Sequence, residues 1–219
     1  MIQALLFDFD GLIIDTESAI IEAWKKAYEL CQIEFPEDRF NAIVGHADVP
    51  FDPWADFKDR DDLPMPVANF KKHINQSVLK EVEAKPILPG ILKTIETAKA
   101  LKLPLGVASN SNHDWVDSHL KRLGLFDEFD AIRCRDDVKK PKPSPDVYLS
   151  LLDFFKLEGE NALAFEDSYT GLTAAKRAGL NCVAIPGPST LSGDFSCADL
   201  KIQSLEEEPL PSLLKKLTP

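Results

Sequence analysis

Two aspartates near the N-terminus stand at alternating positions and are followed by a glycine, in the run Asp8-Phe9-Asp10-Gly11. They directly follow a short apolar run, residues 4–7, which is typical of a buried strand that ends in a loop. Because side chains alternate along an extended chain, the two carboxyl groups point into the same crevice. Such a pair either binds a hard cation or divides the proton transfers of a reaction. Taken alone, a turn with two solvated aspartates is the simpler interpretation.

Other polar side chains recur at the ends of later apolar runs, which favours a functional interpretation of the N-terminal pair. Ser109 follows one run, and the acidic pair Glu166 and Asp167 follows another. Lys142 lies just ahead of a segment that begins like a capped helix. A calcium loop is disfavoured, because residues 12–14 are Leu, Ile and Ile where further acidic ligands would be needed. Together, the carboxylates, the hydroxyl and the ammonium group indicate phosphoryl transfer.

The elements that must position these groups alternate along the chain. Short apolar runs that end in polar or turn residues predict strands, and the segments between them have the apolar spacing of helices. This alternation predicts a doubly wound parallel sheet, an α/β fold that binds ligands at the carboxyl ends of its strands. Ser144 is expected to cap one helix, with Pro145 at the first helical position. The predicted strands cover residues 4–7, 105–108, 162–165 and 182–185, and the predicted helices lie within residues 91–98, 116–123, 147–155, about 170–178 and 206–219.

One long stretch breaks this alternation. From Glu17 to about Lys85 the spacing is helical and no clear strand is present, which predicts a helical insertion after the first strand. Residues 48–66 contain six Asp and four Pro, so regular structure there should be short and irregular, and a well-packed loop is favoured over a mobile lid. We therefore expect a catalytic core made of residues 1–14 and 86–219 and a helical cap made of residues 15–85.

Four sequence motifs follow one another along the chain: DFDGLIIDTES from Asp8, VASNS ending at Ser111, KPSPDVY from Lys142, and FEDSYTG from Phe165. With these motifs the chain resembles the haloacid dehalogenase-like hydrolase superfamily, in its β-phosphoglucomutase-like branch. The resemblance covers essentially the whole chain, although the cap matches only in position and helical character. It implies a Rossmann-like core with a small α-helical cap, in agreement with the organisation inferred from periodicity.

The resemblance also implies a magnesium-dependent reaction. Asp8 would be the nucleophile that forms an aspartyl-phosphate, and Mg²⁺ would be held by Asp8, the backbone carbonyl of Asp10, and Asp167. Glu166 would support the metal through water, which suits the partly hydrated shell that Mg²⁺ prefers. The metal would offset the charge that keeps an anionic nucleophile away from a phosphate monoester.

The other motif residues would bind and protonate the substrate. Ser109, Asn110 and Lys142 would hold the non-bridging phosphoryl oxygens, by hydrogen bonds or as a point charge. Asp10 would protonate the departing alcohol and then take a proton from the attacking water. The simpler alternatives are that Ser109 caps a helix, that Lys142 is one of several solvated lysines, and that Glu166 is a surface charge.

The cap should decide between hydrolysis and transfer of the phosphoryl group to a sugar hydroxyl. Ile20 stands where the resembled mutases have a histidine that suppresses hydrolysis, and residues 45–50 lack an arginine for a second phosphate. The acidic side chains between Asp48 and Asp62 also disfavour a second phosphate. We therefore expect a phosphatase acting on a small phosphomonoester, such as a sugar phosphate, with a phosphosugar mutase as the alternative. Basic cap residues that could contact a substrate anion, although each is more often a solvated helix charge, are Arg39, His46, Lys71, Lys72 and His73.

Two other classes of protein fit the sequence less well. A haloacid dehalogenase uses an aspartate nucleophile on carbon but needs neither a metal nor a second aspartate, so Asp10 and Asp167 argue against it. A non-catalytic phosphometabolite-binding protein would be expected to have lost one of the charged residues, and all of them are present.

Length and composition exclude further classes. A chain of 219 residues with 44% hydrophobic residues is expected to form one globular unit with a sizeable core. A net charge of -11 disfavours nucleic acid and membrane surfaces as partners, and no apolar run reaches the roughly 18 residues that span a bilayer. The four cysteines lack metal-ligand spacing, so they should be reduced thiols in a cytoplasmic protein. The expected partner is a small phosphorylated metabolite; the oligomeric state stays open, with a monomer slightly favoured.

Overall fold

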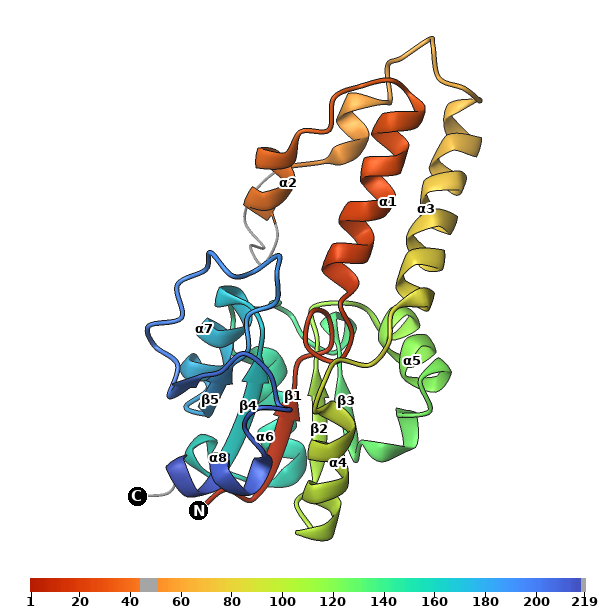
Figure 1. Ribbon diagram of the computed structural model, residues 1–219. Helices are drawn as coiled ribbons and strands as arrows, with labels where there is room; N and C mark the ends of the chain where they lie inside the picture. The colour runs from red at the N-terminus through yellow and green to blue at the C-terminus, as the bar shows by residue number, and fades with distance from the viewer. Residues whose placement is uncertain (44–50, 218–219) are drawn as a thin grey trace.

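The computed structural model describes residues 1–43 and 51–217, and in this part of the chain it contains one parallel six-stranded sheet with helices on both faces (Figure 1). The strand order is β3-β2-β1-β4-β5-β6, so the predicted α/β doubly wound fold is confirmed. In chain order the strands and α-helices are β1 Ala4–Phe7, α1 Thr16–Leu30, α2 Glu37–Ile43, α3 Val67–Ala84, α4 Ile91–Ala100, β2 Leu105–Ala108, α5 His113–Arg122, β3 Ala131–Arg133, α6 Asp146–Phe155, β4 Ala162–Glu166, α7 Tyr169–Arg177, β5 Asn181–Ala184, β6 Leu200–Lys201 and α8 Leu210–Leu217.

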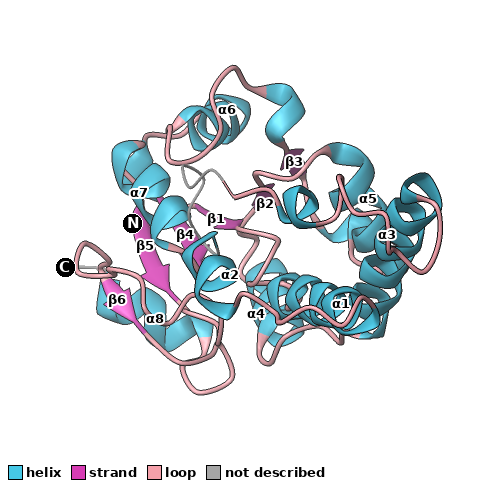
Figure 2. Ribbon diagram, turned by 90° about the horizontal axis from the view of Figure 1, so that it is seen from above, coloured by secondary structure: helices cyan, strands magenta, loops and turns pink. Residues whose placement is uncertain are grey.

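Successive residues of the central strands face opposite layers of the core. Leu5 and Phe7 of β1 pack with α4, α5 and α8, whereas Leu6 packs with α6 and α7. The parallel register places Leu5 beside Leu105 of β2 and Leu163 of β4, so the same alternation runs across three strands. Figure 2 shows α6 and α7 on one side of the sheet and α4 and α8 on the other. Burial on both faces explains why these strands lack polar side chains up to Glu166, the last residue of β4.

The four predicted strands are all present, and two further strands, β3 and β6, extend the sheet at its edges. Both are short and only partly buried, which leaves no apolar run to find in the sequence. The predicted start of α6 is wrong by one residue. Pro145 occupies the position before the helix, and the Ser144 hydroxyl lies 2.6 Å from Asp146 Oδ1 instead of capping a backbone N–H.

The helical segment between β1 and α4 stands above the carboxyl ends of the strands (Figure 1). Its interior is an aromatic cluster in which Trp24 and Tyr28 of α1 contact Phe57, which in turn contacts Phe70. Over residues 51–66 regular structure is limited to a short 3-10 turn, Pro53–Asp56, as the Asp- and Pro-rich sequence predicts. A cap over residues 15–85 needs an apolar core of its own, and this aromatic cluster is of that kind. The division of the chain into two domains stays a prediction.

The two connections of the helical segment run side by side. The N–H of Leu88 donates to the carbonyl of Ile13 at 2.9 Å, and Ile14 forms an antiparallel bridge with Ile87. Lys85 Nζ lies 3.6 Å from Asp15 Oδ2 across the same junction. The chain therefore leaves the sheet and returns to it at one place. Within the two described ranges, none of the helices has the length and apolar character needed to cross a membrane.

Candidate active site

The carboxyl ends of the central strands bring the predicted site residues together. Asp8 follows β1, Ser109 follows β2, and Glu166 ends β4 with Asp167 directly after it. A cavity of about 260 Å³ lies at this edge, and its lining includes Asp8, Asp10, Glu17, Asn110, Lys142 and Asp167. Ser109 and Glu166 do not line this cavity; both are fully buried beneath it.

Lys142 is the cation of the site. Its Nζ lies 2.8 Å from Asp8 Oδ1, 2.7 Å from Glu166 Oε1 and 2.8 Å from the carbonyl oxygen of Ala108. Burial disfavours the ammonium form, but the charges of Asp8 and Glu166 outweigh it and raise the pKa of Lys142 above its ordinary value. Lys142 is therefore a fixed charge inside the protein, and the interpretation as a solvated lysine is excluded.

Glu166 is held from several sides. Its Oε1 accepts hydrogen bonds from Lys142 Nζ and from the hydroxyl of Tyr148. Its Oε2 is buried without a hydrogen-bond partner among the described residues, and a Cβ on Gly171 would lie 1.8 Å from it. Burial and the charge of Asp8 raise the pKa of Glu166 to about 8. The alternative of a surface charge is thus wrong for Glu166.

Three carboxylates gather where the sequence predicts the metal. Asp8, Glu166 and Asp167 each offer an oxygen, and these oxygens lie within 4.8 Å of one another. Burial raises the pKa of Asp167 well above its ordinary value, and the charges of Asp8 and Glu166 add to the effect. Lys142 alone cannot balance three ionised carboxylates, and Glu166 Oε2 has no donor in the part of the chain that the structure describes, so the cluster has the ligand type and the excess acidity that suit a divalent cation. Gly11 adopts a φ of +80° against Asp167, where a Cβ would lie 2.2 Å from Oδ2.

Asp10 faces the segment that follows β2. Its Oδ2 accepts from the Ser111 hydroxyl at 2.7 Å and from the Ser109 hydroxyl at 3.3 Å, and its Oδ1 accepts from Trp115 Nε1 at 2.9 Å. Ser109 caps no helix, because Asn112 is the N-cap of α5. Ser111 and Trp115 were not predicted as site residues, although Ser111 belongs to the second motif.

Asn110 binds the backbone of Lys142 from both directions. Its Oδ1 accepts from the Lys142 N–H at 2.7 Å, and its Nδ2 donates to the Lys142 carbonyl at 3.1 Å. The side chain of Asn110 therefore places the loop that carries Lys142. Its predicted contact with phosphoryl oxygens stays a prediction.

The helical segment contributes Thr16, Glu17 and Ile20 to the described cavity lining. Arg39 is engaged elsewhere, since its Nη1 lies 2.9 Å from Asp56 Oδ2. The basic candidates Lys71, Lys72 and His73 do not line the cavity either. His46 and the rest of residues 44–50 lie outside the described part of the chain.

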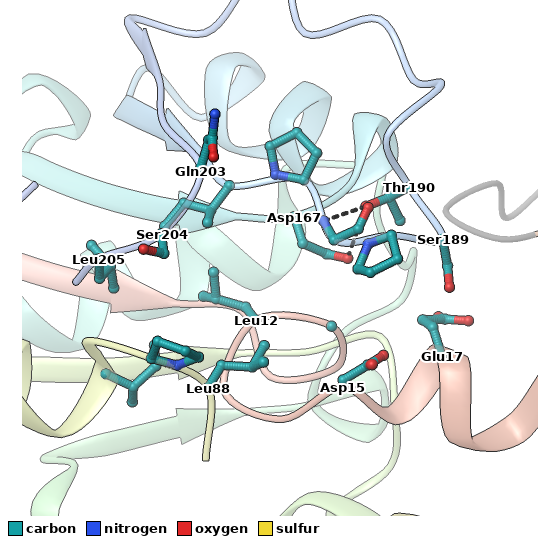
Figure 3. Close-up of a pocket in the computed structure, with 17 residues that line it drawn as sticks. Leu12, Asp15, Glu17, Leu88, Asp167, Ser189, Thr190, Gln203, Ser204 and Leu205 are labelled. Atoms are coloured by element: carbon teal, nitrogen blue, oxygen red, sulfur yellow. Dashed lines mark hydrogen bonds between the residues drawn. The ribbon is translucent and has the colours of Figure 1, made fainter. Parts of the chain in front are cut away.

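A second cavity of about 220 Å³ adjoins the first and shares Glu17, Asp167 and Thr190 with it. Figure 3 shows Leu12 and Leu88 in its centre, with Gln203, Ser204 and Leu205 to one side and Glu17 and Ser189 to the other. Burial raises the pKa of Glu17 to about 7, with the charges of Asp10, Asp8 and Asp15 adding to the effect. Glu17 is not among the site residues that the sequence predicts, although Glu17 belongs to the first motif.

Comparison with known proteins agrees with this geometry. The family model described as haloacid dehalogenase-like hydrolase matches residues 5–185. The chain is 36% identical to YhcW of Bacillus subtilis (strain 168), covering 99% of this chain and 98% of that one. It is 30% identical to the phosphorylated carbohydrates phosphatase of Thermotoga maritima, covering 81% and 82%, and 27% identical to the β-phosphoglucomutase of Bacillus subtilis (strain 168), covering 94% and 95%.

A solved structure shares the fold along nearly the whole chain. The crystal structure of CbbY from Rhodobacter sphaeroides in complex with phosphate has a TM-score of 0.75 and 29% sequence identity, covering 97% of this chain and 99% of that one. The resemblance inferred from the four motifs is confirmed. This chain belongs to the haloacid dehalogenase-like hydrolases, in their β-phosphoglucomutase-like branch.

Proposed function

We propose that this protein is a Mg²⁺-dependent phosphatase that hydrolyses a small phosphomonoester, such as a sugar phosphate, through an aspartyl-phosphate on Asp8. The observation that carries this proposal is the buried cluster in which Lys142 Nζ lies 2.8 Å from Asp8 Oδ1, with carboxylate oxygens of Glu166 and Asp167 close by. The names of the phosphatase and mutase relatives support a reaction on phosphorylated sugars.

Asp8, the backbone carbonyl of Asp10, and Asp167 would hold the metal, with Glu166 supporting it. When bound, Mg²⁺ would offset the negative charge of the phosphoryl oxygens and make the phosphorus more electrophilic. Lys142 adds a second positive charge that is already in place before the substrate arrives, so no reorganisation is needed at the moment of reaction.

The chain's own groups account for both halves of the reaction. A carboxylate oxygen of Asp8 attacks the phosphorus, the ester P–O bond breaks, and Asp10 gives its proton to the departing alkoxide. Water then attacks the phosphorus of the aspartyl-phosphate, and Asp10 takes a proton from that water. The Asp8–phosphorus bond breaks, and inorganic phosphate leaves with Asp8 restored.

The lining of the cavity favours a monophosphate over a bisphosphate. The described residues of the helical segment place an acid and an apolar side chain there, Glu17 and Ile20, and no cation that could bind a second phosphate. The Glu17 carboxylate, which lines the cavity, can accept hydrogen bonds from the hydroxyl groups of a sugar. We further infer a reducing compartment such as the cytoplasm, since all four cysteines are unpaired.

Phosphate release with Mg²⁺ from sugar monophosphates, a sugar bisphosphate, phosphoglycolate and nucleotides tests this proposal. Asp8→Asn should lower the rate by more than about a thousandfold, while Asp153→Asn, an exposed carboxylate on α6, should match the wild type. Rapid quenching with phosphorus-labelled substrate should leave label on the wild-type chain and none on Asp8→Asn. Rapid interconversion of glucose phosphates with little phosphate release would instead establish the mutase alternative.

A further inference from the structure

The carboxylate of Asp10 is fixed at both of its oxygens by side chains from one short segment. Trp115 Nε1 donates to Oδ1 at 2.9 Å, and the Ser111 hydroxyl donates to Oδ2 at 2.7 Å. An aspartate has two side-chain torsions, and donors at both oxygens restrict both of them. The direction in which Asp10 presents its carboxyl group is therefore set by residues 111–115, which run from the loop after β2 into the first turn of α5.

The indole of Trp115 is itself held in place. Its backbone N–H donates to Oδ1 of Asn112, the N-cap of α5, at 2.9 Å. One helical turn later, the buried ring of His119 meets the indole edge-on, with a centroid distance of 4.4 Å. His119 stacks in turn on Phe9, the neighbour of Asp10, at 6.4 Å. Burial lowers the pKa of His119, so this ring is a neutral spacer between Phe9 and Trp115.

Packing alone does not explain the tryptophan. The indole is only partly buried, and it lines the same cavity as Asp8 and Lys142. A phenyl ring would fill much of the same space without a donor, so the indole adds a hydrogen bond to the carboxyl group beside Asp8 that packing does not require. The N–H of Trp115 points to a role in placing Asp10.

We propose that Trp115 is a positioning residue that holds Asp10 in the orientation from which it protonates the leaving oxygen. This inference rests on the proposed phosphatase function. Proton transfer requires the acid within hydrogen-bond distance of the oxygen that receives the proton, and misplacement of a catalytic group by about 1 Å can cost as much as a hundredfold in rate. Trp115 itself neither gives nor takes a proton in the reaction.

Leaving groups of different basicity separate this role from a merely structural one. Trp115→Phe keeps an aromatic ring and removes the N–H donor. We expect kcat/KM for a sugar phosphate, whose alkoxide must be protonated to leave, to fall about tenfold, and kcat/KM for para-nitrophenyl phosphate, whose phenolate leaves unprotonated, to fall less than about twofold. Asp10→Asn should show the same selectivity more strongly. Trp54→Phe, in the aromatic cluster of the helical segment, should change neither value.

An equal loss on both esters, or no loss on either, would overturn the positioning role. The thermal midpoint of Trp115→Phe should stay close to that of the wild type, because the ring is kept. If the midpoint falls, Ser111→Ala removes the donor on Oδ2 without touching the ring stack, and it should give the same selective loss on the sugar phosphate.

A spectroscopic signature reports the contact without any reaction. The chain has three tryptophans, so isotope-labelled protein should give three indole N–H signals in a nitrogen–proton correlation spectrum. The signal missing from Trp115→Phe is that of Trp115, and we expect Asp10→Ala to shift it and to speed its exchange with water, leaving the other two in place. An unchanged Trp115 signal in Asp10→Ala overturns the proposal. A wild type that shows this contact but hydrolyses neither ester contradicts the phosphatase function instead.

Discussion

Lys142 and Glu166 face each other inside the protein, with Nζ 2.7 Å from Oε1 and side-chain exposures of 3% and 0%. The two residues are 24 positions apart and come from different segments, one before α6 and one at the end of β4. Since Lys142 also contacts Asp8, this single ammonium group is the partner of two buried acidic side chains at once. The stability of the site therefore depends on Lys142 more than on any single acid in it.

Replacing Lys142 with methionine should destabilise the protein by about 3 kcal/mol, because removal of one partner leaves buried charges uncompensated. Urea unfolding at neutral pH, with a chelator present, measures this free energy. Lys139→Met, at an exposed position three residues earlier, is the control and should cost less than about 0.5 kcal/mol. Equal stabilities for Lys142→Met and the wild type would contradict the importance of the buried ion pairs.

Alanine at position 171 should destabilise the protein although it lies in helix α7. Alanine favours helices by up to about 1 kcal/mol over glycine, but a Cβ here would lie 1.8 Å from Glu166 Oε2. We expect a net loss of about 2 kcal/mol on thermal or urea unfolding, because Glu166 is pinned by Lys142 and cannot move aside. Gly124→Ala is the contrast: apart from its chain neighbours, no atom of the described residues lies within 4 Å of a Cβ there, and only its φ of +70° opposes the change. A stabilising Gly171→Ala would show that Glu166 is free to move.

Magnesium should stabilise the wild type and not a variant that lacks a ligand. A ligand present at one hundred times its Kd adds about 2.7 kcal/mol to the free energy of unfolding. Calorimetry and thermal unfolding with and without Mg²⁺ should show binding and a rise in Tm for the wild type and for Asp153→Asn. Asp167→Asn should lose at least about nine-tenths of the affinity, because it removes a charged ligand next to Asp8. Unchanged affinity in Asp167→Asn would place the metal elsewhere.

Glu17 should make the metal-free protein less stable as the pH rises. Its pKa is about 7 in the folded chain against an ordinary value of 4.5, so between these pH values the folded chain keeps a proton that the unfolded chain has lost. The free energy of unfolding then falls as the pH rises through this window, by about 2 kcal/mol. Glu17→Gln should remove this loss, so that it is more stable than the wild type at pH 8 but not at pH 4.5.

The pH comparison for Glu17 needs a matched change on the same helix. Glu22→Gln, at an exposed position of α1, should show no such pH-dependent gain. Chemical unfolding with a chelator at the two pH values measures both differences. A Glu17→Gln variant that gains nothing at pH 8 would mean that this carboxyl group is well solvated.

The sequence was enough to predict the sheet because its central strands carry two signals at once. Each of β1, β2 and β4 is a short apolar run that ends in the polar side chains of a motif, as Phe165 and Glu166 illustrate, whereas β5 carries the apolar run alone. The edge strands carry neither signal. β3 and β6 have three and two residues and are partly exposed, so pairing with a neighbour, and not composition, makes them strands.

The sequence predicts the charged residues of the site but not the side chains that hold them in place. The motifs predict that Asp8, Lys142 and Glu166 lie at one edge of the sheet. The contact of Tyr148 with Glu166, in contrast, depends on how α6 lies against β4. Trp115 is outside every motif, and only its spacing of four from His119 marks the two as neighbours on one helix face. The direction of side chains in the helical segment depends on packing between helices, which spacing along the chain does not encode.

The paired connections at Ile13–Leu88 and Ile14–Ile87 have a consequence for how such proteins diversify. Because the two ends of the helical segment meet, a change in its length or contents should put little strain on the strands that flank it. A foreign helical segment joined at these positions should leave Asp8, Lys142 and Glu166 where they are and bring a different set of side chains over them. Exchange of the helical segment during evolution can then change which metabolite is bound, while the residues at the carboxyl ends of the strands stay the same.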